Sequence, residues 1–192
     1  MSRSGALFPF AANYALIGSG TFGDRLQPGQ WWPPAVTTNG VPNEADLRTI
    51  RVLLPPCTIA ALLCEVTAAG STGALVRLGI YAPDPATGLP GALLRDAGTV
   101  SGQTTGFKEA VLATPLVHDG GPLWFARVVQ GGAATKPELR NVTQPWPTGG
   151  SPDLGGGSGW VHAGPTTGAL PDPAPAVLGV ALHSPFVWVR VA

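Results

Sequence analysis

ALVRLGIYA, at residues 74–82, is the stretch of this chain that decides its fold. Large apolar side chains alternate with other residues along it, and a β-strand turns successive side chains to opposite faces. Val76, Leu78 and Ile80 therefore share one face, which we expect to be buried in a core. We expect the opposite face to lie outside that core, with the side chains of Arg77, Gly79 and Tyr81.

Similar strand-length runs recur on both sides of this stretch, with turn residues between them. Residues 83–91 alternate prolines and glycines with polar residues, so we expect a surface loop there. The run 123–129 is apolar on both faces except at Arg127, which places it in the middle of a sheet. Residues 118–122 are expected to form a hairpin turn, and residues 42–49 could form one helical turn. The predicted strands are residues 49–54, 58–68, 74–82, 92–100, 107–112, 123–130, 177–183 and 186–191.

This pattern predicts an all-β protein, an antiparallel jelly-roll-like β-sandwich with an extended N-terminal arm. The length of 192 residues suits one domain. We assign residues 1–46 to a docking arm and residues 47–192 to the sandwich. A long Gly/Pro-rich loop at residues 131–175 is expected to face outward, either as a functional loop with short strands or as an interface element. The side chains predicted to be buried are Cys64, Val66, Val76, Leu78, Ile80, Leu112, Val128 and Val189.

Composition and charge limit the functions open to this chain. Its 11 basic and 11 acidic residues balance, so it lacks a positive field to gather phosphates and we expect no nucleic-acid binding. The longest apolar runs fall far short of the ~20 residues that cross a bilayer, so we expect no membrane insertion. Only 11% of residues are charged, against about 25% in an average soluble domain. That composition favours a component of an assembly, whose surface is shared with neighbours.

The sequence offers little for catalysis, and we predict no enzyme activity, no metal and no cofactor. The three histidines lie far apart, and nucleophile-elbow, HExxH and P-loop motifs are absent from the sequence. Residues 18–23 match a dinucleotide-binding spacing, but no helical pattern follows them. Cys57 and Cys64 lie about 23 Å apart along one predicted strand, so we expect no disulfide between them.

Tryptophan is the one enriched side chain, with six copies. Trp146 and Trp160 lie in the loop at residues 131–175, with His162 close by. An aromatic ring held by a stiff loop suits the apolar face of a sugar, so these three residues form a candidate glycan site. Packing of the two rings on the core or on a subunit is the alternative. The arm carries six aromatic side chains that need a partner surface, and we predict assembly contacts at Phe8, Phe10, Tyr14, Phe22, Trp31 and Trp32.

A series of segments resembles a β-sandwich module of tailed-phage tail fibres and minor tail proteins. It begins with CEVT (64–67), VRLGIY (76–81), GLPGALL (88–94) and DAGTV (96–100). It continues with LWFA (123–126), which follows HDGGP where the family has a T-P-G turn, and with GPTTGALP (164–171), similar to the late G-V-T-G-A-L-P segment of the family. The similarity covers roughly residues 47–192. It implies a virion surface protein on a β-sandwich, often oligomeric, and it transfers no catalytic or binding residue.

We therefore expect a structural component of a phage or phage-like particle, displayed on its tail or head surface as a fibre or spike. Its arm would dock on other virion proteins, and the chain would self-associate, as a homotrimer. Its localisation would be the virion, assembled in the host cytoplasm. Within this hypothesis it binds a host-surface glycan or serves purely as a capsid or tail decoration protein. The alternative from another class is a free carbohydrate-binding, lectin-like module.

Overall fold

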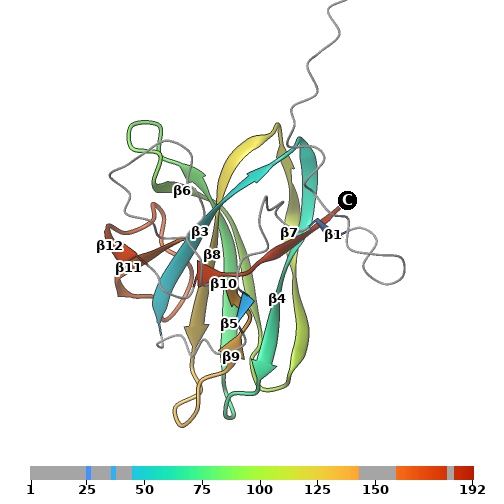
Figure 1. Cartoon of the computed structure of the whole chain (residues 1–192), viewed down its shortest axis with the longest axis vertical. Helices are drawn as coiled ribbons and strands as arrows, with labels where there is room; N and C mark the ends of the chain where they lie inside the picture. Colours follow the sequence, from blue (N-terminus) through green and yellow to red (C-terminus); the bar gives the residue numbers. More distant parts are fainter. Residues whose placement is uncertain (1–24, 27–35, 38–44, 143–158, 181–183) are drawn as a thin grey trace, which may run out of the picture.

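The computed structural model describes residues 25–26, 36–37, 45–142, 159–180 and 184–192. Every regular element in those ranges is a β-strand, and all strand pairs there are antiparallel (Figure 1). Within the same ranges, no helix long and apolar enough to span a membrane is present. The predicted all-β class is confirmed.

The sequence located the long strands well. The structure gives β1 (Arg25–Leu26), β2 (Val36–Thr37), β3 (Asp46–Leu54), β4 (Cys57–Ala68), β5 (Leu75–Pro83), β6 (Pro90–Ser101), β7 (Gly106–His118), β8 (Gly121–Gln130), β9 (Glu138–Leu139), β10 (Asn141–Val142), β11 (Gly159–Pro165), β12 (Val177–Val180), β13 (Ser184–Pro185) and β14 (Trp188–Val191). Residues 46–49 belong to β3, so the helical turn suggested for residues 42–49 is wrong in its described part. The predicted loop at residues 131–175 contains β9, β10 and β11.

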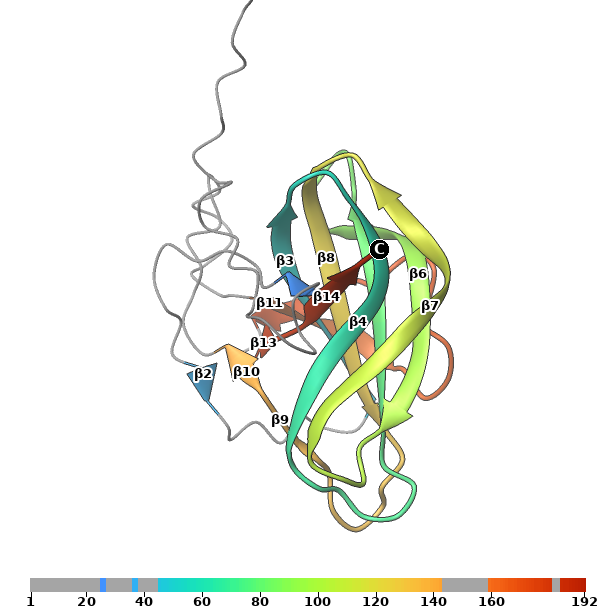
Figure 2. The same cartoon turned by 90° about the vertical axis from the view of Figure 1, so that its right-hand side faces the viewer.

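These strands form two large sheets and one small one. The six-stranded sheet has the order β12-β11-β3-β8-β5-β6, and the five-stranded sheet has the order β1-β14-β4-β7 with β9 beside β4. The small sheet has the order β13-β10-β2. Figure 2 shows the two large sheets stacked, with β4 and β7 in one layer and β3 and β8 in the other. The architecture is therefore the predicted antiparallel β-sandwich.

The jelly-roll character lies in how two pairs of strands wrap around both sheets. Strand β3 pairs with β8 in one sheet, and β4 pairs with β7 in the other. The chain passes directly from β3 to β4 and from β7 to β8. The β3-β8 pair in one sheet is therefore continued by the β4-β7 pair in the other sheet. The prediction of a hairpin turn at residues 118–122 is therefore wrong, because these residues cross from one sheet to the other. This crossing packs on the other crossing, because a Cβ added at Gly120 (φ 98°) would meet Pro56 Cδ at 3.1 Å.

Two apolar cores result, one on each face of the six-stranded sheet. The first lies between the large sheets and includes Leu78, Ile80 and Cys64. The second lies on the outer face of the six-stranded sheet and includes Tyr81 and Val128. All eight side chains predicted to be buried are buried. The expectation that the second face of residues 74–82 lies outside a core is wrong, because Tyr81 and Gly79 are buried there.

Replacing Leu78 with Ala should lower the free energy of unfolding by about 2 to 5 kcal/mol, because the side chain is fully buried and its loss leaves a cavity. Urea titration followed by circular dichroism measures the change. Leu178→Ala is the matched control, since Leu178 is 70% exposed and its truncation should change stability by less than about 0.5 kcal/mol. Equal effects of the two substitutions would contradict the assignment of faces.

Candidate functional site

The structure brings two of the three predicted glycan-site residues together but buries them. Trp160 and His162 both lie on β11, and they are only 8% and 2% exposed. The Trp160 ring belongs to the second core, with Tyr81 and Trp124. A buried ring offers no face to a sugar, so the structure does not support Trp160 and His162 as a glycan platform. Trp146 lies outside the described residues, and its stacking role stays a prediction.

His162 ties β11 to its neighbours through both ring nitrogens. Its Nδ1 lies 2.7 Å from the carbonyl oxygen of Pro175, which can only accept, so Nδ1 carries the proton. The neutral ring therefore accepts at Nε2 from the Thr49 hydroxyl, 2.9 Å away on β3. Burial lowers the pKa of His162, and the Pro175 hydrogen bond opposes that effect only in part. His162 thus serves as a neutral structural link.

The second core is closed by the segment at residues 166–176, which we call the strap. Three side chains of the six-stranded sheet hold its backbone. Gln130 Nε2 donates to the carbonyl oxygens of Thr166 and Gly168, at 2.9 and 2.7 Å. The hydroxyl of Tyr81 donates to the Pro171 carbonyl at 2.8 Å. An Asp96 carboxylate oxygen accepts from the Leu170 amide at 3.0 Å. The strap is thereby a fixed layer of the fold.

Asp96 is the charged member of these anchors. Burial alone would raise its pKa, but hydrogen bonds from the amides of Leu170 and Gly98 and from Arg77 outweigh burial, so the pKa of Asp96 lies below its usual value. Arg77 Nη1 donates to its carboxylate at 2.6 Å. Asp96 therefore stays ionised and holds the strap at neutral pH.

Leu170 is the side chain by which the strap enters the sheet surface. It is buried directly over Gly79 of β5, where an added Cβ would lie 2.1 Å from Leu170 Cδ1. The glycine in the alternating stretch VRLGIY therefore leaves space for a side chain that arrives 91 residues later in the sequence. This contact links β5 to the strap, and its role is packing.

Arg127 is the one charged side chain buried in the middle of β8. Its Nη2 donates to the Asn141 side-chain oxygen at 2.7 Å, and its Nη1 donates to the Arg140 carbonyl at 3.3 Å. Burial lowers the pKa of Arg127 to about 9, which still leaves it charged at neutral pH. The guanidinium thus fixes the chain between β9 and β10 against the six-stranded sheet. In the described part of the chain, no group of three or more His, Cys, Asp or Glu side chains could hold a metal ion.

The outer face of the five-stranded sheet is different, because it leaves large apolar side chains in water. On β7, Ala110, Leu112 and Leu116 point into the first core. The side chains that alternate with them point outward, and three of these are large, apolar and exposed: Phe107 (46%), Val111 (62%) and Val117 (72%). We call Val111, Val117 and their outward neighbours on β7 and β4 the β7 face. It is the candidate interaction surface of this molecule.

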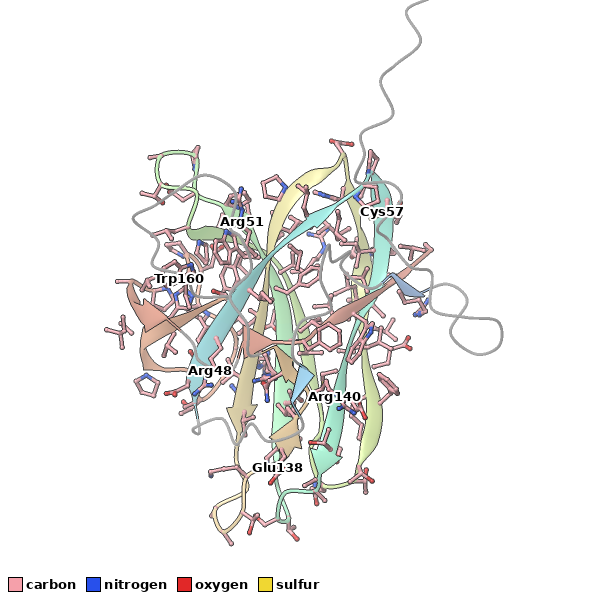
Figure 3. The ribbon with its side chains drawn as sticks, in the orientation of Figure 1. Arg48, Arg51, Cys57, Glu138, Arg140 and Trp160 are labelled. Atoms are coloured by element: carbon pink, nitrogen blue, oxygen red, sulfur yellow. The ribbon has the colours of Figure 1, made fainter. Side chains whose placement is uncertain are left out.

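Paired charges surround the β7 face. Glu109 on β7 accepts from Arg190 Nε on β14 at 2.8 Å, across β4. Glu65 on β4 accepts from Arg140 Nε and Nη2, both at 2.9 Å. Figure 3 labels Arg140 beside β4. The Phe107 ring meets Trp188 edge to face, with 5.0 Å between ring centroids. The face thus carries no net charge, because each of its carboxylates is paired with an arginine.

A bulge in β7 divides this face. The register passes from Ile59 opposite Leu116 to Ala61 opposite Val111, so six residues of β7 stand against three of β4. Arg95 of β6 reaches the bulge and donates from Nε to the Thr114 carbonyl at 3.0 Å. The bulge therefore turns Val117 outward again after Leu116. Sequence alternation alone had ended this strand at Leu112 and missed the exposed valines.

The predicted assembly contacts in the arm, Phe8, Phe10, Tyr14, Phe22, Trp31 and Trp32, lie outside the described residues. What the structure describes of the arm is two short strands, β1 paired with β14 and β2 paired with β10. Comparison of the chain with protein-family models, curated proteins and solved structures found no match.

Gly79→Ala should lower the free energy of unfolding by about 1 to 3 kcal/mol, because the new methyl group overlaps Leu170. Leu170→Ala costs stability of its own because the leucine is buried, but it removes the overlap, so the double variant should lose less than the sum of the two single losses. The relief of the overlap is partial because the Arg95 carbonyl lies 2.9 Å from the added Cβ. Gly168→Ala, with nothing within 4 Å, is the control for the strap itself. Additive effects in chemical denaturation would refute the contact.

Lowering the pH should destabilise the fold through His162. The folded pKa lies below the ordinary value of 6.5, so the unfolded chain binds the proton first. The contribution of the neutral His162 ring to folding stability is complete above pH 6.5. It is lost as the pH falls from 6.5 towards the pKa of His162 in the folded protein. His162→Gln should reduce the dependence of unfolding free energy on pH in this range, which urea titrations at a series of pH values measure. Parallel curves for wild type and His162→Gln would contradict the buried neutral ring.

Proposed function

We propose that this chain is a non-enzymatic structural component of a phage or phage-like particle, displayed on the surface of its tail or head. The observation that carries the proposal is the β7 face, where Val111 and Val117 are exposed on a rigid sandwich. A protein with 11% charged residues and an outward apolar strand suits a position among neighbouring proteins. The arm would supply contacts to other virion proteins.

The resemblance to the phage module supports this proposal at the level of the fold. Its segments fall on β4, β5, β6 and β8, which build the two cores, and on the strap. The segment GPTTGALP supplies Leu170, which packs on Gly79 of VRLGIY. The similar segments are therefore those that must contact one another for the sandwich to close. The resemblance transfers no ligand-binding residue, so it supports a shared scaffold only.

Host-glycan attachment is the second role that we consider within this proposal. It rests on Trp146, flanked by two prolines, since Trp160 and His162 are buried. The exposed valines of the β7 face favour protein contacts, which suits the role of a decoration protein. A free lectin-like module is the alternative of another class, and it would need the same Trp146 platform without any particle.

Two measurements test the proposal. Mass spectrometry of purified particles should find the chain in a fixed ratio to the major capsid or tail protein, and its absence from particles would refute the virion role. Adsorption to host cells then separates the two roles. Trp146→Ala should abolish adsorption if the chain binds glycan, whereas Trp146→Tyr should retain it because tyrosine also stacks on sugar rings. Unchanged adsorption by Trp146→Ala particles would assign the chain to decoration.

A further inference from the structure

We propose that the β7 face binds the uncharged N-terminal segment, residues 4–23, of a second copy of this chain. This inference rests on the proposed role as an assembly component, and it names both sides of the contact. The face is described above, and the segment is the part of the chain that precedes β1. Each copy would give its segment to one neighbour and receive a segment from another.

The size of the β7 face argues for a chain segment as its occupant. Opposite Val117 and Phe107 on β4 stand Thr58 and Glu65, seven residues apart, or about 23 Å along the strand. On β4 and β14 the outward side chains of Ala61, Leu63 and Trp188 are buried, so the exposed part of the face is a single row along β7, one strand spacing of about 4.8 Å wide and roughly 110 Å² in area. A stable contact between two globular surfaces buries about 800 Å² on each partner. The β7 face is too small for that, but one extended segment of about seven residues matches its length.

The chemistry of the β7 face selects an apolar segment without charge. Its carboxylates are already engaged, Glu109 by Arg190 and Glu65 by Arg140, so a charged occupant would find no complementary charge left over. Residues 4–23 contain no Asp, Glu, Lys or Arg and carry four aromatic side chains. Phe8 and Phe10 are separated by one residue, so an extended backbone directs both rings to the same side. These rings would cover the exposed methyl groups of Val111 and Val117.

We assign the segment to a second copy because Val111 and Val117 are 62% and 72% exposed in the single chain, so the face is open to an outside occupant at these two positions. A contact between a segment and a different face is heterologous, and such contacts close into rings when the rotation allows. A cyclic trimer is one such ring.

Light scattering on the purified full chain tests the contact. The face variant carries Val111→Asp and Val117→Asp, and the segment variant carries Phe8→Ser and Phe10→Ser. We expect the wild type to be an oligomer, and each variant to associate at least about tenfold more weakly. Leu178→Asp is the matched control, because Leu178 is an equally exposed aliphatic residue on β12 of the other large sheet. It should retain the mass of the wild type.

Mixing the two variants identifies which chain supplies the segment. The face variant still has an intact segment, and the segment variant still has an intact face, so the mixture should form a 1:1 complex that neither forms alone. If the mixture stays monomeric, the segment binds within its own chain and the proposal is wrong. A monomeric wild type, or variants with the wild-type mass, would overturn it as well.

Two points keep this experiment decisive. If circular dichroism shows that the face variant is unfolded, Val111→Thr with Val117→Thr keeps the shape and strand preference of the side chains and removes only the apolar contact. The assay also needs no particle. Absence of the chain from particles would refute the virion role and leave an observed oligomer in place, whereas a monomeric chain found in particles would refute only the segment contact.

Discussion

The burial of β8 on both faces is the constraint on which the rest of this structure depends. Leu123, Phe125 and Val129 face the first core, and Trp124, Ala126 and Val128 face the second. A single sandwich layer covers only one of these faces, so something else must cover the other. The strap does so, and its anchors come from β8 itself and from β5 and β6, the two strands on one side of β8. The six-stranded sheet is therefore the middle layer of three.

This layering explains why the sequence predicted the strands better than their surroundings. Alternation in residues 74–82 fixed the inward face correctly, because Val76, Leu78 and Ile80 meet the other sheet. The outward face looked exposed, since Arg77 and Gly79 carry no apolar signal. Their partners, Asp96 and Leu170, lie 19 and 91 residues further along the chain, and local periodicity holds no information about such contacts. The run 123–129 did carry the signal, being apolar on both faces, and its central position was predicted.

The candidate site residues also show how little local sequence says about exposure. Trp160 and His162 were selected because aromatic and imidazole groups in a Gly/Pro-rich region often bind ligands, yet β11 pairs with β3 and buries both. Val111 and Val117 do not stand out in the sequence, because the predicted strand ends at Leu112 and nothing in the sequence marks the bulge that follows it. Only the bulge in β7 and its pairing with β4 show that both point outward. Exposure is a property of the assembled sheets, so it cannot be obtained from side-chain chemistry alone.

The contact between Arg95 and the β7 bulge bears on how many copies can come together. Among the described strands, β7 ends the order of its sheet, and a strand in that position is a template for endless cross-β growth when its carbonyl groups stay available. Arg95 occupies the Thr114 carbonyl, and the bulge interrupts the straight backbone on which another strand would align. A high local concentration of this chain therefore carries little risk of fibril formation. Any association between copies is left to side chains on the sheet surface, and such contacts can close at a finite number of copies.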